Sequence, residues 1–271
     1  VQDIASADMD YGRSNVGQGQ KIMVEFVSAN PTGPLHLGHG RQAALGDAVA
    51  SLLEWTGWKV QREYYYNDSG GQMERLALSV WARYHQVLGQ SEPVREDGYH
   101  GRYVMEIAEK FHARVGDLYE GIASTEVLDS MRQLAVEMIR EEQDKDLADF
   151  RVLFDEYYLE SSLYSDGRVR RTVAALRDRG LVYEDGGATW LRTTEFGDQK
   201  DRVMLKSDGT PTYSLPDVAY HVAKWERSFK HDVNVQGAAH HGTTERVRAG
   251  TPAMGLPEGD TDYVLHPTNT D

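Results

Sequence analysis

The feature that most constrains this chain is a strand pattern, a glycine-rich turn and a helix pattern in succession. Residues 21–27 (KIMVEFV) are mostly β-branched or apolar and end at a Pro/Gly cluster, so they predict a strand. Apolar residues then recur at helical spacing and predict a helix from about His39 to Trp55. The apolar segment Trp58–Tyr66 predicts a second strand. The three segments together predict a βαβ unit.

Two histidines lie in the first turn of this unit, which is where ligands of open α/β sheets bind. The start of a helix offers N–H groups and a partial positive charge to phosphate oxygens, and glycines let the backbone approach closely. His36 and His39 are three positions apart and can project towards the same phosphates. They could stabilise the charge that grows during an in-line displacement. Taken alone, the tetrapeptide predicts a proline-rich loop with two surface histidines equally well.

A longer run around these histidines resembles a known family. Residues 24–41 (VEFVSANPTGPLHLGHGR) are similar to the first signature of class I aminoacyl-tRNA synthetases, in the form found in bacterial arginyl-tRNA synthetases. Six ordered matches are far more specific than one tetrapeptide, and they cover nearly the whole chain. The further matches are residues 66–72 (YNDSGGQ), 160–164 (ESSLY), 194–198 (TEFGD), 206–210 (KSDGT) with Tyr213 and 215–221 (LPDVAYH), and Gly237, Ala238, His240, His241 and Gly242.

The pattern and the resemblance predict an α/β protein with a split Rossmann-type nucleotide-binding fold, a parallel sheet and a helical insertion. We expect the first half of the catalytic domain in residues 1–84, the insertion in residues 85–150 and the second half in residues 151–271. The expected elements beyond the βαβ unit are helices at 103–115 and 128–150, hairpins at 181–191 and 203–213, a helix from Pro216 to about Trp225, and a strand at 232–236 that returns to the main sheet.

An acid on the first strand points to a cationic ligand. Glu25 stands among Ile, Met, Val and Phe, where an apolar residue would cost less. Alternation alone also permits an edge strand on which Glu25 points to water, and the residues alone slightly favour this alternative. The resemblance instead implies an arginine pocket, since a guanidinium is matched by acceptors placed in pairs. The residues that it assigns to this pocket are Glu25, Ser28, Asn30, Tyr213 and Asp217.

The last two of these residues are four positions apart. On a helix, Tyr213 would lie one turn before Asp217, a spacing that lets both face one ligand. The alternative for Asp217 is an ordinary helix N-terminal charge.

The resemblance also implies a two-step reaction. The arginine carboxylate attacks the α-phosphate of ATP, with Mg²⁺ carried by the nucleotide, and the terminal ribose of tRNA(Arg) then accepts the arginyl group. His36 and His39 would act as catalytic residues on the phosphates, and Gly38 would make room for the adenosine. Gly237 and His240 would lie near the adenine and ribose. We expect no dedicated metal site, because the sequence has no carboxylate cage and its histidines are scattered.

Composition limits the partners. The formal charge of −14, from 29 basic and 43 acidic residues, argues against general affinity for polyanions, so tRNA would need a local basic surface. Residues 168–171 with Arg177 and Arg179, and Arg246 with Arg248, are candidates, although a solvated helix face is the favoured interpretation of each. No apolar run of about 18 residues predicts a membrane span, and there is no cysteine. We expect a cytoplasmic monomer without a membrane partner.

The chain also departs from the family pattern. Ala239 stands where the family usually has an Asp, and the chain ends at Asp271 before a lysine-rich second signature loop or a helical anticodon-binding domain. The additional N-terminal domain of arginyl enzymes is not recognisable either. We therefore interpret the chain as a catalytic-core fragment with weak or no aminoacylation by itself. Two alternatives remain: a class I nucleotidyltransferase for another amino acid, which the two acids Glu25 and Asp217 disfavour, and a non-catalytic synthetase-derived binding module.

Overall fold

The computed structural model describes residues 2–237, 241–257, 259 and 261–266. The chain forms two compact units, which we describe separately. The first contains residues 1–28, 38–65 and 154–271, and the second contains residues 29–37 and 66–153. The predicted three-part division of the chain stays a prediction, because these units follow contacts in space and not consecutive segments.

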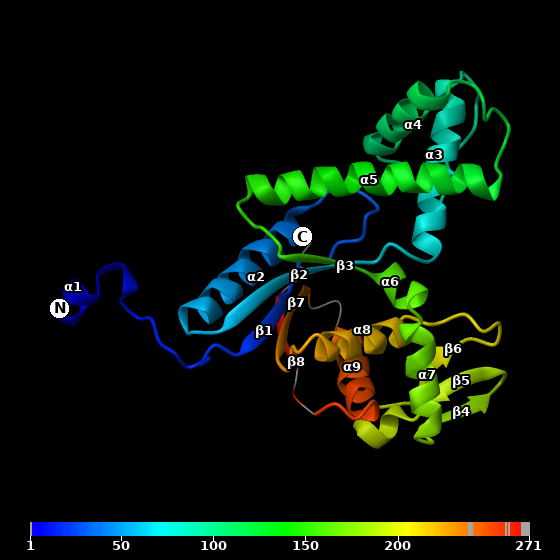
Figure 1. The fold of residues 1–271 in the computed structure, drawn as a ribbon. Helices are drawn as coiled ribbons and strands as arrows, with labels where there is room; N and C mark the ends of the chain where they lie inside the picture. The colour runs from blue at the N-terminus through cyan, green and yellow to red at the C-terminus, as the bar shows by residue number, and fades with distance from the viewer. Residues whose placement is uncertain (1, 238–240, 258, 260, 267–271) are drawn as a thin grey trace. The chain divides into compact units, whose positions relative to one another are not determined.

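A five-stranded sheet forms the centre of the first unit, with the strand order β3-β2-β1-β7-β8 (Figure 1). β1 pairs in parallel with β2 on one side and with β7 on the other, and β7 pairs in parallel with β8. The carboxyl ends of these four strands therefore meet at one edge. The strands are β1 (Lys21–Glu25), β2 (Lys59–Tyr66), β3 (Glu156–Leu159), β7 (Asp232–Gly237) and β8 (Thr261–His266).

The strand order makes β1 and β7 the topological switch point of the sheet. Helix α2 (Leu37–Trp55) leads from β1 to β2, and helix α9 (His241–Ala253) leads from β7 to β8, in the opposite direction across the sheet. In open α/β sheets, ligands bind beyond the carboxyl ends of the strands at such a point. The predicted βαβ unit and the returning strand at 232–236 are both confirmed.

Helix α2 approaches β1 closely because it carries a glycine there. A Cβ atom at Gly46 would lie 2.2 Å from Cγ of Phe26, which follows β1. Ala43 and Ala50 are buried in the same helix. Small residues at these positions therefore fix the distance between α2 and the strand.

The first unit also contains a small antiparallel sheet, β4-β5-β6. Its first hairpin confirms the prediction for residues 181–191, with left-handed Gly186 and Gly187 in the turn. The second predicted hairpin, at 203–213, is reduced to one bridge between Leu205 and Pro211. The Lys206 N–H group donates to the Thr210 carbonyl at 2.8 Å and the Thr212 N–H group to the Met204 carbonyl at 2.9 Å, and the pairing ends there because a helix begins at Ser214. The strands are β4 (Val182–Asp185), β5 (Ala188–Leu191) and β6 (Arg202–Leu205).

The remaining helices of the first unit pack around an apolar core. Pro216 lies in the first turn of α8, as predicted, where its missing N–H group costs nothing. Buried side chains of this core come from the helices and the small sheet, among them Leu163, Leu176, Met204, Leu215 and Ala219. The remaining elements are α1 (Gln2–Ala7), α6 (Glu160–Ser165), α7 (Arg168–Asp178) and α8 (Ser214–Glu226), with short 3-10 helices at Asp8–Asp10 and Thr193–Phe196.

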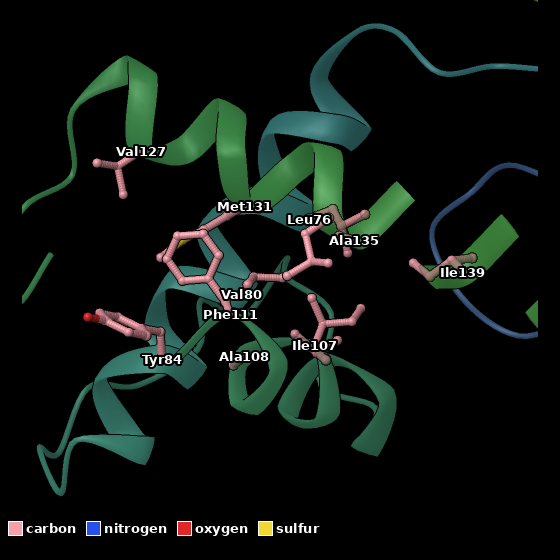
Figure 2. Close-up of a cluster of buried hydrophobic side chains, with 12 residues drawn as sticks. Leu76, Val80, Tyr84, Ile107, Ala108, Phe111, Val127, Met131, Ala135 and Ile139 are labelled. Carbon is pink, nitrogen blue, oxygen red and sulfur yellow. The ribbon is translucent and has the colours of Figure 1, made fainter. Parts of the chain in front are cut away.

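The second unit is a bundle of three helices, α3 (Gly71–Val87), α4 (Arg102–Val115) and α5 (Thr125–Asp149). They share one hydrophobic core (Figure 2). In α4, Val104, Ile107, Ala108 and Phe111 are buried, which is the spacing of one helical face. Both predicted helices are confirmed. α5 begins three residues before the predicted start, because the side chain of Ser124 caps it by accepting a hydrogen bond from the Val127 N–H group at 3.4 Å.

Candidate active site

Glu25 ends a central strand of the sheet. It lies between β2 and β7 and is only 5% exposed. The alternative in which Glu25 sits on an edge strand and points to water is therefore wrong. The reason is that β7, from the far end of the sequence, pairs with the side of β1 that local alternation left open.

The backbone turns sharply after Glu25. The predicted strand at 21–27 ends two residues early, because Val27 and Ser28 have left-handed φ angles of 65° and 41°. This conformation is strained for a β-branched residue such as Val27. It places the Ser28 hydroxyl where Oγ donates to Glu25 Oε1 at 3.2 Å and accepts from the Tyr65 N–H group at 3.1 Å. The turn thus ties the first carboxylate oxygen of Glu25 to the neighbouring strand.

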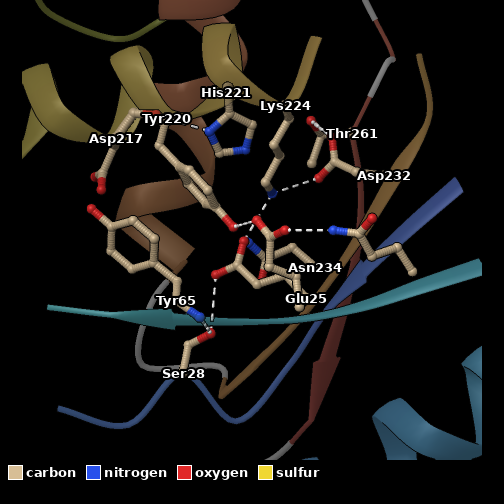
Figure 3. A network of polar contacts seen from close by, with 12 residues as sticks. Glu25, Ser28, Tyr65, Asp217, Tyr220, His221, Lys224, Asp232, Asn234 and Thr261 are labelled. Atoms are coloured by element: carbon tan, nitrogen blue, oxygen red, sulfur yellow. Dashed lines mark hydrogen bonds and ion pairs between the residues drawn. The ribbon is translucent and has the colours of Figure 1, made fainter. Parts of the chain in front are cut away.

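A buried lysine holds the second oxygen of Glu25 (Figure 3). Lys224 Nζ donates to Glu25 Oε2 at 2.8 Å and to Asp232 Oδ2 at 2.9 Å, and Asn234 Nδ2 donates to Glu25 Oε2 at 3.1 Å. Thr261 Oγ1 donates to Asp232 Oδ1 at 2.9 Å. Burial lowers the pKa of Lys224, but the charges of Asp232 and Glu25 outweigh it and hold the pKa above its ordinary value. Lys224 is therefore a fixed cation between two carboxylates.

Asp217, in the first turn of α8, has an unusual environment. Burial raises the pKa of this carboxyl to about 7; Arg246 opposes the shift, and the charges of Glu160 and Glu25 add to it. In Figure 3 the carboxylate of Asp217 and the hydroxyl of Tyr65 point toward one another, and the charge of Asp217 raises the pKa of Tyr65 further after burial and Glu160 have done so. Burial is therefore the main reason for the high pKa of Asp217, and the two neighbouring carboxylates add to it.

Aromatic rings line the same region. Tyr65 Oη donates to Glu160 Oε2 at 3.0 Å, and the rings of Tyr65 and Tyr220 lie 4.4 Å apart. Tyr220 Oη donates to Glu63 Oε1 at 2.6 Å, and Glu63 is also bound by both terminal nitrogens of Arg227 at 2.7 Å. Arg227 thus compensates the charge of Glu63, and Tyr220 and Gln61 donate further hydrogen bonds to the same carboxylate. The ring of Tyr220 also carries the ammonium of Lys224, 4.6 Å from its centre.

Charges close to Asp217 can be compared directly. Glu160 and Glu25 are the carboxylates that raise the pKa of Asp217, whereas Arg246 and Lys224 are the cations that lower it. The named groups therefore carry an excess of negative charge when all are ionised. A guanidinium would reduce this excess and would lower the pKa of Asp217.

The predicted nucleotide residues of the first unit lie at the carboxyl edge of the sheet. Gly38 and His39 are in the first turn of α2, and Gly237 is the last residue of β7. A helix of this length presents N–H groups and positive dipole at its start, which suits phosphate. His240 lies outside the described residues. His36, exposed, belongs to the second unit.

Asn30 also belongs to the second unit, where its contacts are local. Asn30 Nδ2 donates to Gln72 Oε1 at 2.7 Å, and Gln143 Nε2 donates to the carbonyls of Asn30 and Gly33 at 3.2 and 2.8 Å. Tyr103 Oη donates to the carbonyl of Thr32 at 2.6 Å. The loop that carries Asn30 is therefore held by side chains of the three-helix bundle.

Tyr213 lies at the N-cap of α8, one turn before Asp217, and is 68% exposed. The structure thus brings Glu25, Ser28 and Asp217 together within the first unit.

The sequence analysis did not identify Lys224, Asp232 and Asn234. Lys224 and Asn234 bind Glu25, and Asp232 binds Lys224. A usable signal was present for Lys224, which lies two helical turns after Asp217 on the same face of α8.

The described part of the chain offers neither a cluster of metal ligands nor a membrane-spanning helix. No group of three or more histidine, aspartate or glutamate side chains there could hold a metal ion. No helix there has both the length and the apolar character to cross a membrane.

The sequence matches a family model and many relatives. Residues 1–236 match the model for tRNA synthetases class I (R), catalytic domain. Arginine–tRNA ligases of Cupriavidus taiwanensis and Thiobacillus denitrificans are each 55% identical, over 94% and 98% of this chain but only 44% and 49% of their own length. The chain therefore spans about half the length of the curated relatives that it matches.

Solved structures agree. A protein of Campylobacter jejuni assigned as an arginyl-tRNA synthetase aligns with a TM-score of 0.88 at 30% identity, over 98% of this chain and 58% of that one. The arginyl-tRNA synthetase of Thermus thermophilus aligns with a TM-score of 0.69 at 22% identity, over 92% of this chain and 48% of that one, which supports the fold alone. The α/β prediction is confirmed, and the chain belongs to the family of class I arginyl-tRNA synthetases, whose catalytic domain it matches over residues 1–236.

Proposed function

We propose that the natural protein to which this chain belongs activates arginine with ATP and transfers it to tRNA(Arg). The observation that carries the proposal is the excess of carboxylate around Asp217, whose pKa burial raises to about 7, at the carboxyl end of the sheet. A guanidinium is the cation that best fits paired carboxylates beside aromatic rings. Family membership supports the same substrate.

The arginine site of this proposal consists of Glu25, Ser28, Asn30, Tyr213 and Asp217. Glu25 has an acceptor position left on Oε1 beside the bond from Ser28, and Asp217 offers a carboxylate in an environment that favours an added cation. The arginine carboxylate would then attack the α-phosphate of ATP, which gives arginyl-adenylate and pyrophosphate. The terminal ribose of the tRNA would take the arginyl group in the second step.

For ATP, the proposal assigns the phosphates to His36, His39 and the start of α2, where N–H groups and the helix dipole favour anions. Gly38 leaves space for the nucleotide, and Gly237 and His240 would lie by the adenine and ribose. Mg²⁺ would arrive with the nucleotide and would neutralise phosphate charge.

We further propose that residues 85–150 are inserted between the halves 1–84 and 151–271 of the catalytic domain, and that the protein is a cytoplasmic monomer. The local order of long helices after the first strand pair supports the insertion, and a sequence without cysteine suits a reducing compartment.

The test is amino-acid-dependent exchange of pyrophosphate into ATP by the full-length natural protein, with tRNA(Arg) present. Arginine should stimulate the exchange, and Asp217→Asn should raise the KM for arginine much more than the KM for ATP. Stimulation by another amino acid and not by arginine would favour the alternative nucleotidyltransferase. Binding of ATP or tRNA without any exchange would favour a non-catalytic module.

A further inference from the structure

Lys224 is a buried charged group that the proposed reaction does not use. Its side chain is 1% exposed, and its contacts join three strands: β1 through Glu25, β7 through Asp232 and, through Asp232, β8 at Thr261 (Figure 3). Its ammonium also lies 4.6 Å from the centre of the Tyr220 ring. Two carboxylates and one aromatic face thus satisfy its three N–H donors.

We infer that Lys224 is a positioning residue for arginine, which acts by fixing the carboxylate of Glu25. This inference rests on the proposed function, because it concerns the same pocket. A carboxylate offers about four acceptor positions. Lys224 and Asn234 occupy two of them on Oε2, and Ser28 occupies one on Oε1.

One acceptor position of Glu25 therefore remains, and it lies on the oxygen that Lys224 does not bind. With Oε2 held at 2.8 Å and 3.1 Å, the carboxylate cannot rotate without breaking two hydrogen bonds, one of them charge-assisted. Glu25 can thus offer a single, directed acceptor to one N–H group of the amino acid. Without Lys224 the carboxylate would be free to turn, and its charge would be compensated by neutral donors alone.

The competing explanation is that Lys224 only clamps α8 onto the sheet. A buried ion pair is a poor way to gain stability, since apolar residues of similar volume often stabilise as much or more. Arg227, the residue after α8, forms a second ion pair, with Glu63; neither side chain has a hydrogen bond to the Glu25 carboxylate, so this pair can serve as a control. A clamp predicts similar consequences for both pairs, whereas positioning predicts an effect on arginine for Lys224 alone.

The test compares Lys224→Met with Arg227→Met in the full-length natural protein, by the pyrophosphate exchange described above. Loss of a charge-assisted hydrogen bond that fixes a binding group should raise the KM for arginine about tenfold or more in Lys224→Met, with the KM for ATP within about twofold. Arg227→Met should leave the KM for arginine within about twofold. Equal changes in both variants, or equal changes in both KM values of Lys224→Met, would overturn the inference.

A second variant and a crystal structure test the inference further, including the case in which Lys224→Met does not fold. If Lys224→Met does not fold, Lys224→Arg retains the cation with a different reach and should raise the KM for arginine at least about threefold; an unchanged KM would refute positioning. A crystal structure of either variant should show Glu25 Oε1 displaced from Ser28 Oγ, and an unmoved Glu25 would also overturn the inference. The two proposals can therefore fail separately. A wild-type protein without arginine-dependent exchange would contradict the proposed function, whereas the position of Glu25 in the variant structures tests only the role of Lys224.

Discussion

The affinity for arginine should depend on pH through Asp217. Its pKa is raised to about 7, first by burial and then by Glu160 and Glu25, against the opposing charges of Arg246 and Lys224. Burial raises the pKa values of Tyr65 and Tyr263 above the ordinary value of about 10, and the charge of Asp217 adds to both shifts, so neither phenol titrates between pH 6 and pH 8. A carboxyl with a pKa of about 7 is ionised to roughly 10% at pH 6 and roughly 90% at pH 8.

If the guanidinium binds only the ionised form, the affinity for arginine should rise about tenfold between these pH values. Arginine binding should also release about half a proton at pH 7, because the bound cation lowers the pKa of Asp217. Isothermal calorimetry at pH 6, 7 and 8, in buffers of different ionisation enthalpy, measures both quantities. Asp217→Asn should bind weakly with no pH slope. A slope of the same size in wild type and in Asp217→Asn would refute this reasoning.

Three further predictions concern stability and catalysis. Gly46→Ala should lower the melting temperature by several degrees, since its Cβ would lie 2.2 Å from Phe26, whereas Gly40→Ala, whose Cβ meets nothing within 4 Å, should not lower it. His39→Ala should reduce kcat in pyrophosphate exchange about 10- to 100-fold without changing the calorimetric affinity for arginine, and His112→Ala is the control. Asp217→Asn should melt at a higher temperature than wild type at pH 8 without ligand. The raised pKa means that the folded protein binds this proton more tightly than the unfolded chain, so wild-type stability falls as the pH rises from about 4 to about 7. The difference should be small at pH 4, and equal differences at pH 4 and pH 8 would contradict this explanation.

The local sequence pattern predicts those helices and strands whose stabilising contacts come from residues near in the sequence. The βαβ unit was predictable because its strand, turn and helix signals are all contained in residues 21–66. The second hairpin at 203–213 is shorter than its pattern predicts, because α8 begins at Ser214 and leaves only the bridge between Leu205 and Pro211. Helix α5 begins earlier than its apolar spacing predicts, because the Ser124 cap lies before the first apolar residue of the pattern.

The burial of Glu25 and Lys224 depends on strand pairing between distant parts of the sequence, which the local pattern does not contain. Glu25 could be read as an edge residue because its neighbour across the sheet, Asn234, lies at the other end of the sequence. Lys224 looks like a surface lysine in the segment AKWER, and its burial becomes intelligible only when residues 25 and 232 are known to lie beside it. The resemblance could supply Glu25 and Asp217, but the supporting groups follow from the pairing of β1 with β7.

Three departures from the usual rules of stability occur around one carboxylate. Val27, a β-branched residue, has a left-handed φ angle; a glutamate is buried in a central strand; and a lysine is buried against two acids. Each is unfavourable by itself, since backbone strain and charge desolvation both oppose folding. Departures scattered over the molecule would indicate only that the fold tolerates unfavourable residues. These departures instead act on the two oxygens of Glu25: Ser28 holds Oε1 and Lys224 holds Oε2. Such convergence is expected where the position of an acceptor matters more than the stability of the strand that carries it.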